Sequence, residues 1–551
     1  MTNIMRGDIT YALKEIRSYQ QKGRAFGTMD PASLLRLPPE ILDGILALID
    51  NHEDILSFAL ANKKCSEFAI PRHTQYRILR IRHPYPQLWA HLAQRADLAS
   101  LITHVHIADN NTLLFTERKP STLVPQSDGQ NPLDETVRIL NICKAINNMK
   151  SLRSFIWELH MRYRRPTLLP EHEDSILRTL RKRKTLEYLA LIGPFGSHAQ
   201  SYSHDPESKL YPLWRFGNLK FLNLLGDAWV RPAVTYHVLR LLANLPHLEH
   251  LVIPLEFFHL HRLTFPSLKA LRLQLLTGAS ASLDLTRSQF IERHTTLEHL
   301  CWFPLALPSL TPEALPNLKG LSTTRHVVEC LASVAPPPPT PSSLSFAVFQ
   351  NLPSITEDPR EMNTVLPTPS GTIRRPIECL DVRSLDARSL LDFHQYFLDS
   401  RKLRKLKLHT FYDVSDVCQV GDTFPEVTWL WLPNAHLPSG SAHPKAIELE
   451  DLYTIVSHFP HLEVLRGQAA WTGAGYEFDQ MHHAIFQLAT MLPNLRQLDH
   501  SGFDEHRQAF KRIEIQREIV VEDGQEVEHL NYKVVKPKLR DTWDIFDGSF
   551  D

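Results

Sequence analysis

The chain has few cysteines, and their positions exclude a disulfide framework. No two of them form a Cys-x-x-Cys pair in the 551 residues, and the six are Cys65, Cys143, Cys301, Cys330, Cys379 and Cys418. We therefore expect free thiols in a reducing compartment rather than a secreted, cross-linked protein. The 29 histidines are scattered and give no metal-ligand spacing, so we expect no metal and no other cofactor.

Long apolar runs are also missing. A membrane-spanning helix needs roughly 18 or more consecutive apolar residues, and no such run occurs, so we expect no membrane partner. The segment 1–27 mixes acids and bases without an apolar centre, unlike a secretory signal peptide. We expect a protein of the cytoplasm, the nucleus or both.

Neither sign of charge is in surplus. Lys and Arg total 60, Asp and Glu total 61, and the net charge is −1. Neutralising a phosphate backbone requires a basic surplus, so nucleic acid is not expected as the main partner. The one dense basic run, RTLRKRK at 178–184, lies at the end of a predicted helix, where cations complement the helix dipole. We favour that interpretation over a nuclear signal.

The linear motifs of catalysis are missing too. The chain has no Gly-x-Ser-x-Gly nucleophile elbow, no phosphate-binding Walker loop and no His-Glu-x-x-His zinc motif. The Gly-Ala-Gly in TGAGYEF lacks a third glycine and the strand–turn–helix context of a dinucleotide site. We therefore expect no enzymatic activity and no catalytic residue.

A short phrase repeats through most of the chain: one apolar residue, two variable ones, an apolar, a variable, an apolar and a variable residue. Typical copies are TLEYLAL, HLEHLVI and KLRKLKL, and a weaker copy, LITHVHI, lies at 101–107. Most copies follow one another by 20 to 35 residues, and their first apolar positions are 152, 186, 219, 248, 268, 297, 318, 377, 403, 427, 462 and 495. The alternation at the end of the phrase predicts a short strand.

The residues before many of these strands predict helices. In the segment 389–397, Leu390, Phe393 and Phe397 recur three and four residues apart, and elsewhere Pro246, Pro460 and Pro493 end the helical pattern. Units of one helix and one strand bury their apolar faces only by stacking. We therefore predict an α/β solenoid with a concave parallel sheet and helices on the convex side.

This pattern resembles leucine-rich repeats in an irregular form with longer helices, although the usual Asn or Cys after the third leucine is missing. The alternative is a conventional α/β domain with coincidental phrases. We assign the solenoid to 84–502, with a proline-rich insertion at about 335–376 and a second polar insertion at 109–133. The first is interpreted as a plain insertion, and the alternative is a polyproline ligand. Residues 503–551 are predicted to form a hairpin around Asp523-Gly524 and an acidic, aromatic tail.

The segment 37–71, LPPEILDGILALIDNHEDILSFALANKKCSEFAIP, predicts a small helical packet. Pro38 and Pro39 suit a first helical turn. The apolar stripe that follows is wider than a one-sided helix requires. Asp50 or Asn51 is a candidate cap for a second helix, and we expect Lys63 and Lys64 at that helix's C-terminal end, where the helix dipole favours cations.

These residues resemble an F-box, and the continuation AIPRHTQYRILRI is similar to that of fungal F-box proteins. The leading Leu-Pro-x-Glu-Ile-Leu, the basic pair and the closing Phe-Ala-Ile-Pro occur in the family's order. Cys65 stands where the family usually has an aromatic or long aliphatic residue. We assign the F-box to 34–83 and treat 1–33 as an N-terminal extension.

The resemblance implies a substrate-recognition subunit of a Skp-cullin-F-box ubiquitin ligase, which binds a Skp-type adaptor through the F-box and a protein substrate through the repeats. The implied adaptor contacts are Leu37, Pro38, Ile41, Leu42, Ile45, Ile49, Leu56, Leu60, Lys63 and Phe68. Two alternatives stay open. These helices could merely cap the solenoid, or the chain could be a leucine-rich scaffold without a link to ubiquitin.

The third, fifth and seventh places of the phrase are expected to face the concave side. In the N-terminal half they include Tyr188, Phe221, Asn223, His250, Arg272 and His299. In the C-terminal half we predict a substrate patch that prefers an acidic or phosphorylated segment and consists of Arg383, Lys405, Lys407, Trp429, Trp431 and Arg466. A register shifted by one residue would instead bury both tryptophans in the core.

Overall fold

The structure is a computed structural model, and it describes the larger part of the chain. The described residues are 37–49, 52–70, 72–81, 85–108, 117–120, 135–159, 169–199, 211–257, 260–276, 283–332, 374–438, 443–504, 509–522 and 525–535. The predicted N-terminal extension, most of both insertions, the Asp-Gly turn of the hairpin and the acidic tail lie outside these residues.

Within the described residues, one sheet of 16 strands runs through the molecule, and its strands follow the chain order. Neighbouring strands are parallel from β1 to β16, and only β17 and β18 are antiparallel additions at the end. The strands are β1 (Ile78–Ile81), β2 (His104–Ile107), β3 (Ser154–Glu158), β4 (Tyr188–Ile192), β5 (Phe221–Leu225), β6 (His250–Pro254), β7 (Ala270–Gln274), β8 (His299–Trp302), β9 (Gly320–Thr324), β10 (Cys379–Arg383), β11 (Lys405–Lys407), β12 (Trp429–Trp431), β15 (Val464–Arg466), β16 (Gln497–Asp504), β17 (Ala509–Glu522) and β18 (Gln525–Val535). A separate antiparallel pair joins β13 (Ala435–His436) to β14 (Lys445–Ala446).

Helices fill most of the connections between these strands. They are α2 (Pro39–Leu48), α3 (His52–Ala61), α4 (Lys63–Ala69), α5 (Arg72–Gln75), α6 (Pro86–Gln94), α7 (Ala96–Ala99), α8 (Glu135–Asn148), α9 (Pro170–Arg181), η3 (Pro212–Arg215), α10 (Pro232–Ala243), η4 (Leu260–Arg262), α11 (Asp284–Arg293), α12 (Arg325–Leu331), α13 (Ala387–Phe397), α14 (Val414–Thr423), α15 (Leu449–Ser457), α16 (Ala469–Gly473) and α17 (Phe478–Met491). None of the helices in the described part of the chain is long and apolar enough to cross a membrane.

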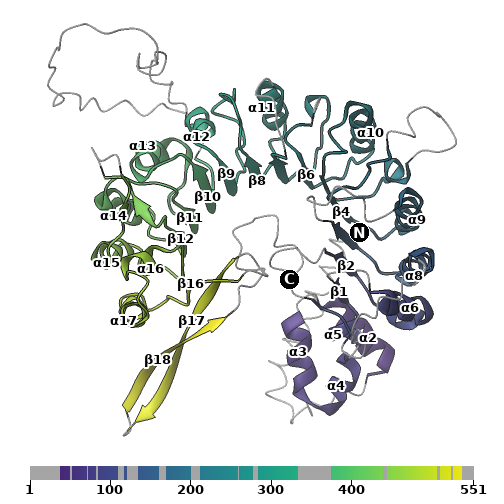
Figure 1. Cartoon of the computed structure of the whole chain (residues 1–551), viewed down its shortest axis with the longest axis horizontal. Helices are drawn as coiled ribbons and strands as arrows, with labels where there is room; N and C mark the ends of the chain where they lie inside the picture. Colours follow the sequence, from purple (N-terminus) through teal and green to yellow (C-terminus); the bar gives the residue numbers. More distant parts are fainter. Residues whose placement is uncertain are drawn as a thin grey trace, which may run out of the picture.

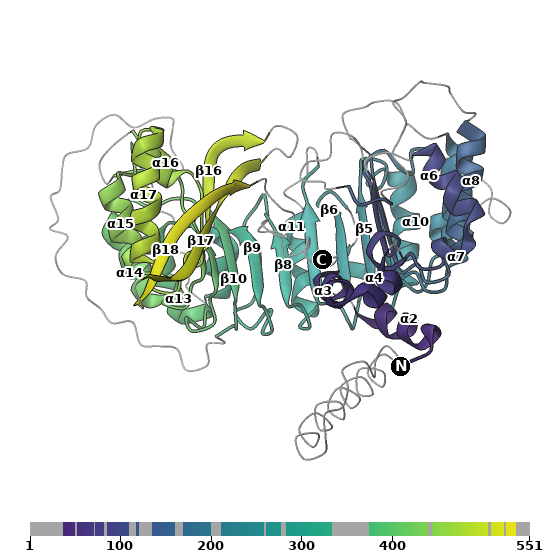
Figure 2. The ribbon, with the colours of Figure 1, turned by 90° about the horizontal axis from the view of Figure 1, so that it is seen from below.

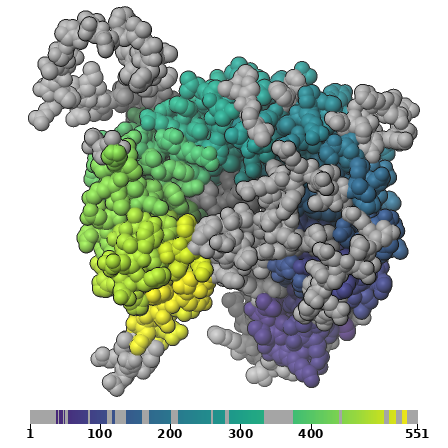
Figure 3. Space-filling model, in the orientation of Figure 1, coloured from purple at the N-terminus to yellow at the C-terminus, as the bar shows by residue number. Residues whose placement is uncertain are grey.

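The strands line the inside of an arc and the helices its outside (Figure 1). This confirms a leucine-rich-repeat-like α/β solenoid with a concave parallel sheet. In the view turned by 90°, the hairpin of β17 and β18 lies at the end that carries α15–α17 (Figure 2). The helices α2–α5 lie at the opposite end of the arc, beside β1 (Figure 1), and form the purple lobe of the space-filling view (Figure 3).

A column of aliphatic side chains holds the parallel strands in register. The central apolar residue of each strand pairs with that of the next, and no residue of this column is more than 3% exposed: Leu189, Leu222, Leu251, Leu271, Leu300, Leu321, Leu380, Leu406, Leu430, Leu465 and Leu498. The predicted helix residues Leu390, Phe393 and Phe397 are buried against the same core. Because strand side chains alternate, the residues on either side of each central leucine face the concave surface.

Charges alternate in sign along the residues that directly precede the strands. Across nine consecutive units the second place of the phrase is occupied by Arg153, Glu187, Lys220, Glu249, Lys269, Glu298, Lys319, Glu378 and Arg404. Lys220 donates a hydrogen bond to Glu187 at 2.8 Å. Lys269 donates to Glu249, and Lys319 donates to Glu298, each at 2.7 Å. We call this row the charge ladder. Opposite charges on adjacent strands favour this register, although each exposed pair contributes only about 1 kcal/mol or less.

The N-terminal helices form a packet with its own small core of Leu46, Ile55, Ala59 and Ala69. The Arg77 guanidinium donates to the carbonyl oxygens of Leu46 and Ile49, which ties α2 to the residue before β1. The first strand of the sheet thus lies inside the segment assigned to the F-box, so the packet and the solenoid are joined without a linker.

The expected placement of Lys63 and Lys64 is wrong. They begin α4 instead of ending α3, because Asn62 caps α4 by accepting a hydrogen bond from the Cys65 amide at 3.0 Å. The two cations therefore lie at the helix end that repels them. Asparagine is a preferred N-cap residue, so Asn62 was the signal in the sequence that places this boundary.

The C-terminal hairpin packs back on the last helix. Arg517 donates to the carbonyl oxygens of Ala489 and Leu492 at the end of α17, at 2.6 and 3.0 Å. The Tyr532 hydroxyl lies 2.9 Å from His482, and its ring lies edge-on to Phe486. The hairpin therefore covers the open end of the solenoid, as a terminal cap of a repeat array must.

A buried arginine just before β10 joins the loop after β8 to the end of α12. The guanidinium of Arg375 donates to the carbonyl oxygens of four residues, Pro312, Ala314, Leu315 and Leu331. Leu331 is the last residue of α12, so one side chain satisfies both a loop and a helix end. Burial lowers the pKa of Arg375 to about 10, while the charge of Glu313 acts in the opposite direction.

We expect Arg375→Met to lower the free energy of unfolding by about 2–4 kcal/mol, because it leaves several buried carbonyl groups without a donor. Arg374→Met is the matched control, since Arg374 is exposed, and it should change stability by no more than about 0.5 kcal/mol. Urea unfolding followed by circular dichroism measures both. Equal stabilities of the two variants would contradict the role given to Arg375.

Candidate functional site

The first two helices of the packet each have a buried and an exposed apolar face. On α2, Leu42 is 1% exposed, whereas Ile41 is 51% exposed and is followed one turn later by the exposed Ile45. On α3, Ile55 and Ala59 belong to the packet core, whereas Leu56 is exposed and Leu60 is 85% exposed. Large aliphatic pairs four residues apart thus lie on the surface of both helices. Such exposure is typical of an interaction surface.

The ten implied adaptor contacts divide into three groups. Most are exposed, and these are Leu37, Pro38, Ile41, Ile45, Leu56, Leu60 and Lys63. Ile49 and Phe68 are half-buried and pack on the packet core. Leu42 is fully buried, so the prediction that it lies on the contact surface is wrong: the stripe on α2 is wide because one half of it builds the interior.

The concave orientation of the two predicted tryptophans is confirmed. Leu430 is completely buried, and Trp429 and Trp431 are half-buried on the other side of β12. Trp429 is in register with Lys405, and Trp431 with Lys407 on β11. The shifted register, which would have placed both indoles under the helices, is therefore excluded.

Asp381 is the acidic centre of the neighbouring strands. It accepts hydrogen bonds from the Ser322 hydroxyl at 3.0 Å and from His409 Nε2 at 2.6 Å, and Lys407 Nζ lies 3.8 Å away. Burial works against ionisation of this carboxyl, but the hydrogen bond with His409 and the charge of Lys407 outweigh it, so the pKa of Asp381 lies below its ordinary value. Lys407 is thus partly neutralised within the protein.

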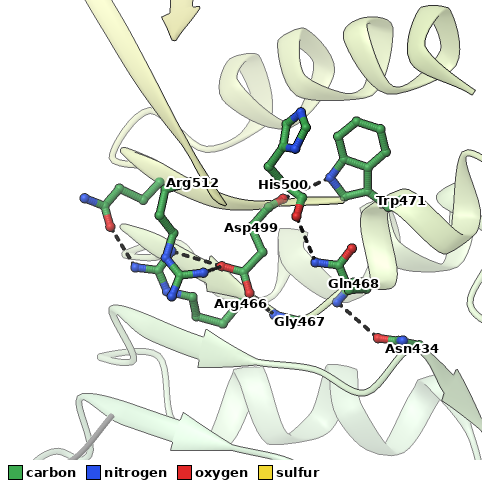
Figure 4. Close-up of polar contacts among 9 residues, drawn as sticks. Asn434, Arg466, Gly467, Gln468, Trp471, Asp499, His500 and Arg512 are labelled. Atoms are coloured by element: carbon green, nitrogen blue, oxygen red, sulfur yellow. Dashed lines mark hydrogen bonds and ion pairs between the residues drawn. The ribbon is translucent and has the colours of Figure 1, made fainter. Parts of the chain in front are cut away.

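Arg466, predicted to be an accessible cation of the substrate patch, is buried instead at 3% exposure. Its guanidinium donates to Asp499 at 3.2 Å and to the Gln497 side chain at 2.8 Å. Arg512 on β17 donates to the same carboxylate, which also accepts the Gly467 amide at 3.0 Å (Figure 4). The prediction is wrong here because β17 turns back beside β16 and brings a second arginine over this end of the sheet.

A second polar group joins the turn after β15 to β16. The Trp471 indole donates to the backbone oxygen of Asp499 at 3.0 Å, and Gln468 donates to that of His500 at 3.3 Å (Figure 4). The backbone N–H of Gln468 in turn donates to the Asn434 side-chain oxygen at 3.1 Å. These contacts close the sheet beyond β12 and leave the accessible part of the patch on β10, β11 and β12.

Two of the predicted cations remain exposed there, Arg383 and Lys405. The Arg383 guanidinium lies over the Phe303 ring at 4.0 Å, and Lys407 Nζ lies 5.3 Å from the centre of the Trp431 ring. Cation–π contacts of this kind position a charge without neutralising it. The patch therefore presents positive charge beside aromatic rings.

The N-terminal half of the concave face carries an apolar cluster. Phe221, Leu225, Val252 and Ala270 form a cluster separate from the main core, and Tyr188 stacks on Phe221 at a ring distance of 3.6 Å. The concave positions predicted from the sequence include Tyr188, Phe221 and His250, but Val252 and Ala270 were not among them. Val252 occupies the fifth place of its copy of the phrase and Ala270 the third place of its copy, and these places were the signal in the sequence for a concave position.

Among the described residues, no group of three or more His, Cys, Asp and Glu side chains could hold a metal ion. None of the six cysteines, all of which lie in the described part of the chain, forms a disulfide bond. Burial raises the pKa of the Cys379 thiol, which points away from a reactive thiolate on the concave face.

The comparisons with known proteins identify no family. No family model and no curated protein matches the chain. Nineteen chains of solved structures match it. One of these belongs to the crystal structure of the Rad7 and Elc1 complex in yeast, with 11% identity over 84% of this chain and 92% of that chain, and a TM-score of 0.37. A similarity this low carries no argument, and the strand order itself is the evidence for the solenoid.

We expect Asp381→Asn to lower the free energy of unfolding by about 1–2 kcal/mol at pH 7, because the amide cannot match the charge of Lys407. Since the pKa of Asp381 in the folded state is depressed, this difference should persist above the ordinary value of 3.8 and disappear as the pH falls further. Guanidinium unfolding between pH 7 and pH 3 measures it. The exposed Asp413→Asn serves as control, and a difference independent of pH would contradict the assignment.

Proposed function

We propose that this protein is the substrate-recognition subunit of a Skp-cullin-F-box type ubiquitin ligase. In this role the N-terminal packet binds a Skp-type adaptor and the solenoid binds a protein target. The observation that carries the proposal is the pair of exposed aliphatic faces on α2 and α3, at positions that the F-box resemblance marks as adaptor contacts.

The packet is suited to such docking because its exposed face is not needed for its own stability. Leu46, Ile55, Ala59 and Ala69 form the interior, and Arg77 anchors α2 to the sheet. A partner can therefore cover Ile41, Ile45 and Leu60 without unfolding the packet. Burying apolar surface contributes roughly 25 cal/mol per Å² before the costs of association.

The alternative is a leucine-rich scaffold that binds a partner without any link to ubiquitination. It shares the solenoid but does not require an adaptor on α2 and α3. In either role we expect no catalytic residue in this chain, since ubiquitin transfer would belong to partner subunits of the ligase.

We expect the full-length chain to bind a purified Skp-type adaptor, and Ile41→Asp combined with Leu60→Asp to weaken that binding by at least about tenfold, because each change places a charge in an apolar contact. Isothermal titration calorimetry measures the affinity. Leu42→Asp is unsuitable because Leu42 lies in the interior.

Leu307→Asp provides the matched control. Leu307 is also an exposed leucine, at 75%, but it lies after β8 and far along the chain from the packet. We expect this variant to bind the adaptor like the parent chain. No binding by the parent, or equal binding by all variants, would favour the scaffold instead.

A further inference from the structure

The concave face of the C-terminal half carries more cations than anions. Between β10 and β16 its charged residues are the cations Arg383, Lys405, Lys407 and Arg466 and the anions Asp381 and Asp499. Arg512 adjoins them from β17 and shares Asp499 with Arg466. This local excess is notable because the whole chain has 60 basic and 61 acidic residues.

The charge ladder shows that this excess is not a general property of the strands. One residue before the strands, nearly every cation has an anion on the adjacent unit, as in Lys319 and Glu298. On the concave face, Lys405 instead lies between Cys379 and Trp429, which offer no carboxylate in register. Positive potential therefore extends from the concave face toward a ligand.

Aromatic rings accompany these charges. Trp429 and Trp431 flank Leu430 and are half-buried, so each indole presents part of its surface. Lys407 stands over Trp431, and Arg383 over Phe303. Neighbouring strands lie about 4.8 Å apart, which brings Lys405 and Trp429 within reach of consecutive side chains of one extended ligand.

We infer that the concave face of β10–β12 binds an extended acidic segment of a partner protein, with its carboxylates at Arg383 and Lys405 and an apolar or aromatic side chain against Trp429 and Trp431. Charge complementarity selects this occupant. The inference rests on the proposed function only in identifying the partner as the recruited substrate.

A single-stranded nucleic acid is also anionic and stacks on aromatic rings. It fits this face less well, because the acidic Asp381 lies in the same row as Lys407 and Trp431. A regular phosphate backbone along this row would run past the Asp381 carboxylate, whereas a peptide can place its acidic groups selectively.

The test measures, by fluorescence anisotropy, the binding of fluorescein-labelled 12-residue peptides to the full-length chain. One peptide alternates Asp with Phe and Ser, the second has Lys in place of Asp, and a single-stranded oligonucleotide of equal charge is the third ligand. We expect the acidic peptide to bind at least tenfold more tightly than the lysine peptide, and less tightly as salt is raised.

Lys405→Glu and Arg383→Glu should each weaken binding of the acidic peptide about tenfold, and Trp429→Ala should weaken it by a similar factor. Arg404→Glu is the matched control, because it makes the same change of charge one residue before Lys405. Arg404 belongs to the charge ladder and pairs with Glu426. We expect it to leave peptide affinity within about twofold of the parent.

Three outcomes would overturn the inference: equal binding of the acidic and lysine peptides, tighter binding of the oligonucleotide, or equal loss in Arg404→Glu and Lys405→Glu. Adaptor binding is measured on the same samples. A chain that binds the adaptor but not the acidic peptide refutes this inference alone, and a chain that binds the peptide but not the adaptor refutes the proposed function alone.

Discussion

The rest of the molecule depends on one buried leucine at the same place in every parallel strand of the main sheet from β4 to β16. Because side chains of a strand alternate between faces, a slip of one residue would move Leu430 into solvent and both tryptophans of β12 into the core. The leucine column makes that exchange costly in each strand, and the parallel ladder couples the strands. The composition of the concave face, including which cations can meet a ligand, follows from this constraint.

Charge is distributed around the same column in two different ways. In the charge ladder, which lies one residue before the strands, acids and bases alternate and form ion pairs, so the net charge of the ladder is small. On the concave face of β10–β12, the charges are not matched. The near-zero net charge of the chain is therefore an average over two surfaces of different character, and the average by itself gives no indication of a cationic patch.

The sequence was sufficient for features that depend on periodicity. It predicted the strands, the helix residues Leu390 and Phe397, and the concave direction of Trp429, because period and direction are local properties. It was insufficient where a distant segment arrives. Arg466 has the position of a concave cation, but Arg512, 46 residues later, shares its carboxylate and closes the site. Leu42 and Ile41 likewise look equivalent in the sequence, but the packing of α2 buries Leu42 and leaves Ile41 exposed.

The two candidate surfaces belong to different cores. The packet surface rests on Leu46, Ile55, Ala59 and Ala69, whereas the strands of the substrate patch rest on the main core of the solenoid, which contains none of these residues. Substitutions at distant sites without shared partners have additive effects on stability. A substitution at Ile41 should therefore leave the concave patch folded, and a loss of charge at Lys405 should leave the packet intact. In the proposed function, this independence would allow one chain to hold two proteins, since neither contact would have to be rebuilt when the other forms.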